Sequence, residues 1–150
     1  MRAFDSPLHV VQFDAHLDYA SVEGVLRHTN AHAFRHIARM DTVEGLVQAG
    51  IRSLRTSRSA WQATKAHGNA VVGPNELRCD GADAVLAHVP RDARCYVSID
   101  VDVLDGALVP GCASAEPDGL SYAELRDVLR ALAEHAEIVG VDLVEVNHDG

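Results

Sequence analysis

The sequence predicts an α/β fold with a mostly parallel β-sheet. Five apolar or β-branched segments alternate with stretches that carry helix signals, which is the pattern of consecutive strand–helix–strand units. Three of these segments run into clusters of polar and acidic residues, as strands do when a parallel sheet presents ligands at its carboxyl edge. The chain has 150 residues and is 47% hydrophobic, so we expect residues 1–150 to form a single domain with its own core.

The expected elements have local reasons in the sequence. Ser57 can cap a helix, and Ser121 with Glu124 three residues later forms a capping box. The pair Gly73-Pro74 ends the third expected strand. The expected strands are residues 8–13, part of 43–54, 69–72, 94–101 and 138–146; the expected helices are 33–40, 59–66, 81–88 and 121–135; residues 15–31 are expected to be loop.

Composition and charge narrow the classes of function. The net charge of −9 argues against a nucleic-acid partner held through phosphate contacts. There is no run of roughly 18 apolar residues, and residues 1–11 lack the apolar core of a signal peptide, so we expect neither a membrane span nor secretion. The three cysteines show no CxxC spacing, which indicates reduced thiols and a cytoplasmic location.

The stretch from Tyr96 to Gly111 combines a buried strand with a cluster of carboxylates. Asp100 and Asp102 occupy positions i and i+2 at the end of this strand, so we expect both side chains on the same side. Two carboxylates there would repel each other and resist burial unless a cation lay between them. Because the stretch contains no lysine or arginine, the pattern favours a metal ion.

A second candidate cluster, DAHLD, follows the first expected strand. Asp14, His16 and Asp18 share one side if the backbone stays extended. Taken alone, the motif fits an N-cap aspartate, a loop histidine and a solvated aspartate equally well. Carboxylate and imidazole donors together suit Mn²⁺, Fe²⁺, Co²⁺ or Zn²⁺. With the two aspartates above, the five ligands predict a two-metal site that makes hydroxide from water near neutral pH, and hence a hydrolase.

Four motifs resemble those of the ureohydrolases, the family of arginase and agmatinase: DAHLD, SIDVDVLDGALVPG, CASAEPDGLSYAELRDVL and VGVDLVEVN. The resemblance runs from about Leu8 to Asn147 and implies a three-layer α/β/α, arginase-like fold around two Mn²⁺ ions. It implies that a hydroxide bridging the metals attacks the guanidino carbon of a small cationic substrate and releases urea and an amine. A role in polyamine metabolism and, for a full-length chain, a homo-oligomer would follow from the same resemblance.

The resemblance also assigns roles to individual residues. The implied metal ligands are Asp14 and Asp100, which bridge the ions, Asp18 on the first ion, and His16 and Asp102 on the second. Glu145 matches the acidic residue that pairs with the substrate guanidinium. His32, with His28 as a neighbouring alternative, is the candidate for a proton-shuttling histidine. Asp105 matches a residue that supports the loop, and we do not expect it to bind metal.

Two departures from the family pattern bear on the site. Gly106 replaces a proline after the third aspartate, which loosens the loop. Ala20 stands where arginase has an asparagine that holds the amino-acid end of arginine, so we expect a substrate without that end. Agmatine is the leading expectation, and a guanidino acid also fits; formimidoylglutamase and guanidinobutyrase specificities are alternatives.

A third departure concerns the ends of the chain. Nothing before Leu8 resembles the family's Gly-Gly-x-His-Ser segment, which supplies a histidine to the first ion, and no final helix follows the last strand. We therefore expect the chain to lack an N-terminal strand–helix unit and a C-terminal helix of the family. Two alternatives to a working ureohydrolase stay open: a weakly active or non-catalytic metal-binding fragment, and a zinc deacetylase of the same fold.

Overall fold

The computed structural model describes residues 4–21 and 28–147. The strands in this part of the chain form one sheet in the order β3-β2-β1-β4-β5. They are β1 (Leu8–Phe13), β2 (Val43–Ala49), β3 (Ala70–Val72), β4 (Arg94–Asp100) and β5 (Glu137–Val144). Every pairing between neighbouring strands is parallel, so the predicted α/β class with a parallel sheet is confirmed. Part of the expected loop at 15–31, residues 22–27, lies outside the described residues.

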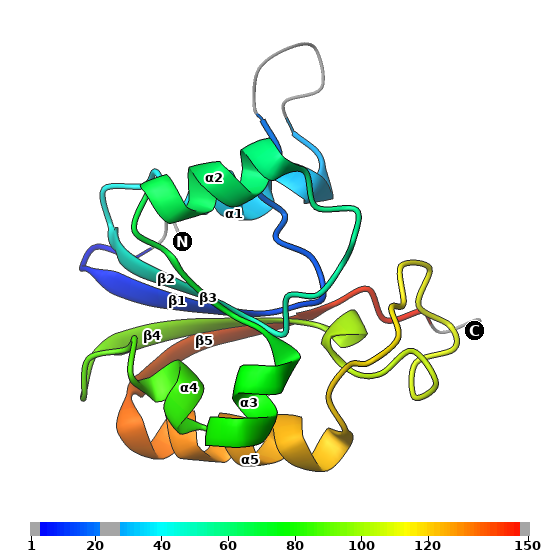
Figure 1. Cartoon of the computed structure of the whole chain (residues 1–150). Coiled ribbons are helices and arrows are strands. Elements are labelled where there is room, and N and C mark those ends of the chain that lie inside the picture. The colour runs from blue at the N-terminus through cyan, green and yellow to red at the C-terminus, as the bar shows by residue number, and fades with distance from the viewer. Residues whose placement is uncertain (1–3, 22–27, 148–150) are drawn as a thin grey trace.

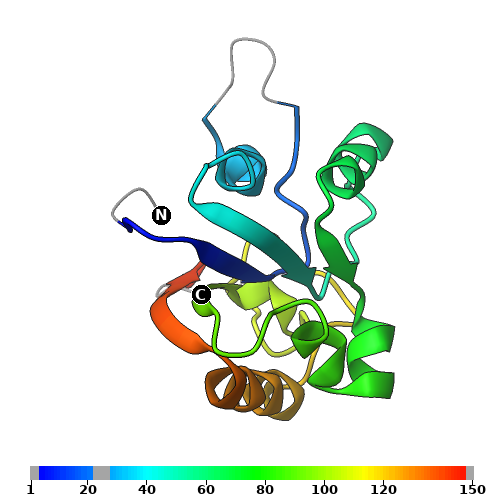
Figure 2. The ribbon, with the colours of Figure 1, turned by 90° about the vertical axis from the view of Figure 1, so that its left-hand side faces the viewer.

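Helices cover both faces of the sheet. Figure 1 shows α1 (Ala33–Ile37) and α2 (Arg58–Ala66) on one side, with α3 (Pro74–Asp80), α4 (Asp83–Leu86) and α5 (Tyr122–His135) on the other. The same separation is visible in the turned view of Figure 2. The fold is therefore the three-layer α/β/α arrangement that the resemblance implied. None of the described helices is long and apolar enough to cross a membrane.

The alternation of side chains along the central strands creates two cores. Val11 and Phe13 of β1 point to the layer of α3, α4 and α5, where they join a core that includes Leu132 of α5. Val10 points to the opposite layer and packs with Phe34 of α1 and other residues of a smaller core. Both faces of β1 are thus buried, as a central parallel strand requires.

The helix signals in the sequence are partly confirmed. Ser57 accepts a hydrogen bond from Ala60 N at the start of α2, and Ser121 and Glu124 form the expected capping box of α5. The sequence analysis missed α3, because Gly73-Pro74 was interpreted only as a strand ending. Proline at the first helical position is also a helix-start signal, and the Glu76 carboxylate accepts a hydrogen bond from Gly73 N at 2.7 Å.

The order of the strands fixes where a ligand can bind. β2 and β3 lie on one side of β1, and β4 and β5 lie on the other. The loops that leave the carboxyl ends of β1 and β4 therefore run to opposite sides, and a crevice forms between them. β1 leads into the DAHLD loop and β4 ends at Asp100. The two predicted ligand clusters therefore lie on either side of this crevice.

Candidate metal centre

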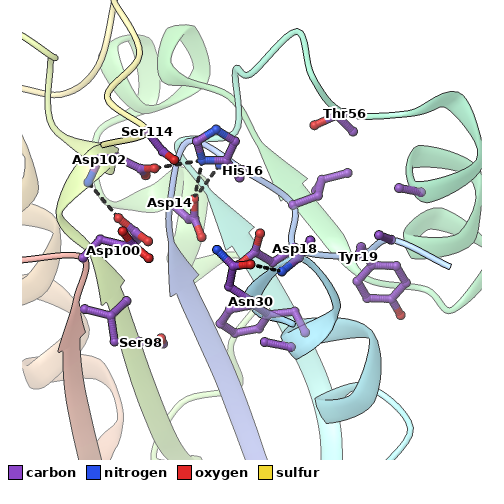
Figure 3. Close-up of a pocket in the computed structure, with 18 of the residues that line it drawn as sticks. Asp14, His16, Asp18, Tyr19, Asn30, Thr56, Ser98, Asp100, Asp102 and Ser114 are labelled. Carbon is purple, nitrogen blue, oxygen red and sulfur yellow. Dashed lines mark hydrogen bonds and ion pairs between the residues drawn. The ribbon is translucent and has the colours of Figure 1, made fainter. Parts of the chain in front are cut away.

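Segments that follow β1, β2, β4 and β5 line a cavity of about 660 Å³ at the carboxyl edge of the sheet. Asp14 follows β1, Asp100 ends β4 and Glu145 follows β5, and all three line the cavity. Because β1, β4 and β5 are consecutive in the sheet, their carboxyl ends are neighbours. Figure 3 shows the acidic side chains and His16 gathered above the ends of the strands.

Asp14, His16 and Asp102 form the first group that could hold one ion. His16 Nδ1 lies 2.8 Å from Asp102 Oδ2 and 3.4 Å from Asp14 Oδ1, as the dashed lines of Figure 3 indicate. The second oxygen of Asp102 accepts a hydrogen bond from Ala15 N at 2.9 Å, which ties the two loops together. Asp14 and Asp102 are 2% and 1% exposed, so bulk water does not solvate their charges.

Asp100, Asp102 and Cys112 form a second group, again with ligand atoms within 4.8 Å of one another. The sequence predicted that strand alternation would bring the two aspartates together, but in the structure a turn brings them together. β4 ends at Asp100, and residues Val101–Val103 form a 3-10 turn in which Asp102 N donates to Asp100 Oδ1 at 3.0 Å. The thiol of Cys112 was not anticipated, because its position in the sequence has no metal-ligand spacing.

The DAHLD segment also departs from the expected extended conformation. His16 N donates back to Asp14 Oδ1, and Asp18 adopts a positive φ of 47°. Asp18 lines the cavity but belongs to neither group of three. Glu145 lines the cavity as well, at a positive φ of 59°. Positive φ is uncommon for residues other than glycine and is concentrated in turns and functional sites.

The structure does not bring His32 to the cavity wall. His32 is 8% exposed, and its Nδ1 lies 2.6 Å from Thr29 Oγ1. Its neighbours Asn30 and Ala31 line the cavity instead. The ring of His28 stacks on His36, with a centroid separation of 5.2 Å, and does not line the cavity either.

Asp142, which the sequence analysis did not select, lines the cavity beside Ser98. The Asp142 carboxylate accepts hydrogen bonds from Ser98 Oγ at 2.7 Å and from Tyr96 OH at 2.9 Å. Its signal in the sequence was present: an aspartate interrupts the apolar run of the last strand, three residues before Glu145. Asp105 behaves as expected and supports its loop by accepting from Ala107 N and Gly119 N.

Burial and mutual repulsion perturb the carboxylates of the site. Burial, reinforced by neighbouring carboxylates, raises the pKa of Asp100 to about 8 and that of Asp18 to about 7. Burial also raises the pKa of Asp14. The contacts with Asp102 and then Asp14 raise the pKa of His16 to about 10. Burial thus favours the neutral carboxyl forms of Asp14, Asp18 and Asp100, and the neighbouring carboxylates favour a protonated His16.

A buried network of glutamine side chains hydrogen-bonds to the DAHLD loop. Gln12 Nε2 donates to Asp14 Oδ2 at 2.7 Å and to His16 O at 3.1 Å. Gln48 on the neighbouring strand donates to Gln12 Oε1 at 2.6 Å and to Leu17 O at 2.7 Å. Thr64 of α2 in turn donates to Gln48. The network fixes one oxygen of Asp14 and leaves the other facing His16, which is how outer-shell partners orient metal ligands.

Two arginines from the loop after β2 supply positive charge that the sequence analysis did not place here. Arg52 donates to the backbone carbonyls of Asp102, Leu104 and Glu116, among others, and so ties two loops of the site together. Arg55 lies 2.9 Å from His16 Nε2 and pairs with Glu116 at 3.2 Å. Arg52 thus donates to backbone carbonyls and Arg55 pairs with Glu116, so neither guanidinium is hydrogen-bonded to Asp14, Asp100 or Asp102 side chains among the described residues.

The donor set fits a divalent metal ion. Asp14, His16 and Asp102 offer two carboxylates and one imidazole, a combination that suits Mn²⁺ and other borderline divalent ions. Asp102 Oδ2 is buried and lies 2.8 Å from His16 Nδ1. When His16 releases its proton, Nδ1 and Asp102 Oδ2 would direct lone pairs at the same point, where a divalent metal ion could take the place of the proton.

Comparison with known proteins places this site in a family. The Arginase family model matches residues 1–149. The chain is 33% identical to an N(1)-aminopropylagmatine ureohydrolase of Thermus thermophilus, over 97% of this chain and 47% of that protein. It is 30% identical to the formimidoylglutamase of Bacillus subtilis, over 92% of this chain and 45% of that protein. The chain thus spans about half the length of the curated relatives it matches.

Solved structures give the same picture. The proclavaminate amidino hydrolase of Streptomyces clavuligerus superimposes with a TM-score of 0.84 at 30% identity, covering 95% of this chain and 48% of that one. The formimidoylglutamase of Bacillus subtilis superimposes with a TM-score of 0.78 at 29% identity, covering 94% of this chain and 46% of that one. With the family model matched along nearly the whole sequence, the chain belongs to the Arginase family.

Proposed function

We propose that this chain carries the metal-binding core of a hydrolase that cleaves a guanidino compound into urea and an amine, with Mn²⁺ as the metal. The single observation that carries the proposal is the convergence of Asp14, His16 and Asp102, whose ligand atoms lie within 4.8 Å of one another, beside a second group that contains Asp100 and shares Asp102. Membership of the Arginase family supports the reaction type. The Mn²⁺ assignment is consistent with the mixed carboxylate and imidazole donors.

The ligands divide by position. Asp14, His16 and Asp102 would hold one ion, and Asp100, which is grouped with Asp102 and Cys112, would help to hold a second. Asp18 lines the same cavity and would contribute a further carboxylate. The metal, when bound, supplies Lewis acidity that activates water for attack. Gln12 keeps Asp14 oriented, and the Ala15 amide keeps Asp102 oriented. These contacts fix the ligands before an ion arrives, so binding requires little reorganisation.

Glu145 and Asp142 would bind the substrate. A guanidinium is planar and donates pairs of parallel hydrogen bonds, which carboxylates accept well. Glu145 faces the same cavity as the metal ligands, so a guanidinium bound to it would lie beside the ions. In the reaction, a water oxygen bonds to the guanidino carbon, the bond to the alkyl-bearing nitrogen breaks, and that nitrogen takes a proton as urea leaves.

The substrate is expected to lack an α-amino acid end, because Ala20 lines the cavity with a methyl group and offers no hydrogen bond there. Agmatine and guanidino acids both meet this condition. A formimidoyl amino acid, cleaved to formamide and the amine, is a second candidate. It is favoured by the similarity over 92% of this chain to a formimidoylglutamase.

The experiment is a metal and substrate screen. The purified protein, stripped and reloaded with Mn²⁺, is incubated with agmatine, 4-guanidinobutanoate, arginine and formimidoylglutamate, and urea or formamide is measured. We expect release from a substrate without a free α-amino group only when metal is present. Release from arginine above all others would contradict the interpretation of Ala20, and metal-independent release would contradict the proposed mechanism. Asp102→Asn is the inactive control, because it removes one charge from the first group.

A further inference from the structure

Arg55 brings a positively charged side chain to a cavity that is lined by several acidic groups. Six carboxylates line it: Asp14, Asp18, Asp100, Asp102, Asp142 and Glu145. Among the described lining residues, Arg55 is the one lysine or arginine. Arg55 lies on the outer side of His16: its Nη2 is 2.9 Å from His16 Nε2, whereas His16 Nδ1 faces the buried Asp102. A substrate with its guanidinium among the buried carboxylates could therefore direct its other end toward Arg55.

We infer that Arg55 is a specificity residue that binds a carboxylate at the far end of the substrate. The inference rests on the proposed function and narrows its substrate class to ω-guanidino acids and formimidoyl amino acids. A cationic tail, such as the ammonium of agmatine, would meet like charge at this wall. The leading expectation from the sequence, agmatine itself, is therefore replaced by its carboxylate counterparts.

Arg55 is paired with Glu116 and keeps a further donor for a ligand. Nε and Nη2 donate to one oxygen of Glu116, at 3.3 and 3.2 Å, and Nη2 donates to Ser114 O. Within the described residues, Nη1 has no hydrogen bond. The side chain is 61% exposed, so it can move toward a ligand without breaking a packed core.

The compensating carboxylate, Glu116, is shared. It accepts a hydrogen bond from Ser53 Oγ at 2.8 Å and lies 3.5 Å from His16 Nε2. Because Glu116 is shared by Ser53, His16 and Arg55, a substrate carboxylate could also pair with Arg55.

The backbone at the start of α2 adds partial positive charge near Arg55. The cavity wall continues from Arg55 through Thr56 and Ser57 to Ala60, the beginning of α2. The positive end of the helix dipole lies there, and the first turn of α2 contains no acidic residue. This field adds to the attraction that Arg55 exerts on a carboxylate.

The test compares 4-guanidinobutanoate with agmatine, which have the same guanidinium and opposite tail charges. Ligand-induced shifts in the unfolding temperature of the Mn²⁺-loaded protein give apparent affinities, and urea release is measured in parallel. We expect the wild-type protein to prefer 4-guanidinobutanoate by about tenfold or more, the effect of a charged hydrogen bond. Arg55→Glu should reverse the preference, and Arg55→Lys should keep its sign. Arg130→Glu makes an equal charge change at an exposed position of α5 and should leave the wild-type ratio of the two affinities unchanged.

The possible results separate the role of Arg55 from the proposed function. A wild-type preference for agmatine, no binding of either ligand, or an Arg55→Glu ratio equal to that of the wild type would overturn the inference. Urea release with an unchanged ratio would overturn the inference alone and leave the proposed function intact. A charge-dependent ratio in binding without urea release would overturn the proposed function and support the carboxylate-binding role of Arg55.

Discussion

The substitution Gln12→Leu tests whether the buried amide network positions the metal ligands. Gln12 is 1% exposed and makes three hydrogen bonds, to Asp14, to His16 O and from Gln48. Leucine has a similar size but no polar atoms, so it removes all three bonds and leaves two buried acceptors without this donor. At about 1 kcal/mol for each neutral bond and more for the bond to a carboxylate, we expect a loss of about 2–4 kcal/mol in the free energy of unfolding.

The same change should weaken metal binding, because Asp14 loses the partner that orients it. Loss of such outer-shell contacts costs about 10- to 100-fold in metal affinity. Urea-induced unfolding of the metal-free protein measures the first effect, and titration with Mn²⁺ under chelator competition measures the second. Gln62→Leu, at an exposed position of α2, is the matched control and should change neither quantity. A Gln12→Leu variant that unfolds within about 0.5 kcal/mol of the control and binds Mn²⁺ equally well would refute the role of the network.

Three further predictions concern the acidic cluster and its support. Asp100→Asn and Asp102→Asn should each lower bound Mn²⁺ in elemental analysis; unchanged metal content in both would remove the metal site. Arg52→Met should reduce the free energy of unfolding by about 2–4 kcal/mol in urea denaturation, because it leaves several partly buried carbonyls without this donor; a loss like that of an exposed arginine would contradict this. Folded-state pKa values of about 7 for Asp18 and about 8 for Asp100 lie above the unfolded value of 3.8, so the folded state binds more protons in this range. The metal-free protein should therefore lose stability as pH rises from 4 to 8, and calorimetry showing a gain would contradict the burial of these carboxylates.

The sequence by itself determined the elements whose signals are local. The apolar run of β1 and the caps at Ser57 and Ser121 depend on residues within a few positions of one another, and the structure confirms them. The alternation of strand and helix signals was enough for the parallel α/β class, because parallel strands need a crossover of this kind. The acidic residues after the strands could likewise be found from sequence, since a parallel sheet carries ligands at its carboxyl edge.

Only the tertiary structure decided how these residues meet. Asp102 reaches His16 through a 3-10 turn and across 86 positions of sequence, which a strand pattern does not contain. Gln12 and Gln48 are hydrogen-bonded because β1 and β2 are neighbouring strands in which these two positions are paired. No local sequence signal marks either glutamine as the partner of the other.

The placement of the arginines was also a property of the folded chain. The sequence analysis invoked a metal because the central acidic stretch has no lysine or arginine, yet Arg52 and Arg55 arrive from the loop after β2. Charges from distant segments meet only when the sheet order has been set, so local sequence cannot indicate which cation compensates which carboxylate. Here Arg52 binds backbone carbonyls and Arg55 pairs with Glu116, so neither arginine pairs directly with the carboxylates that the sequence had marked as metal ligands.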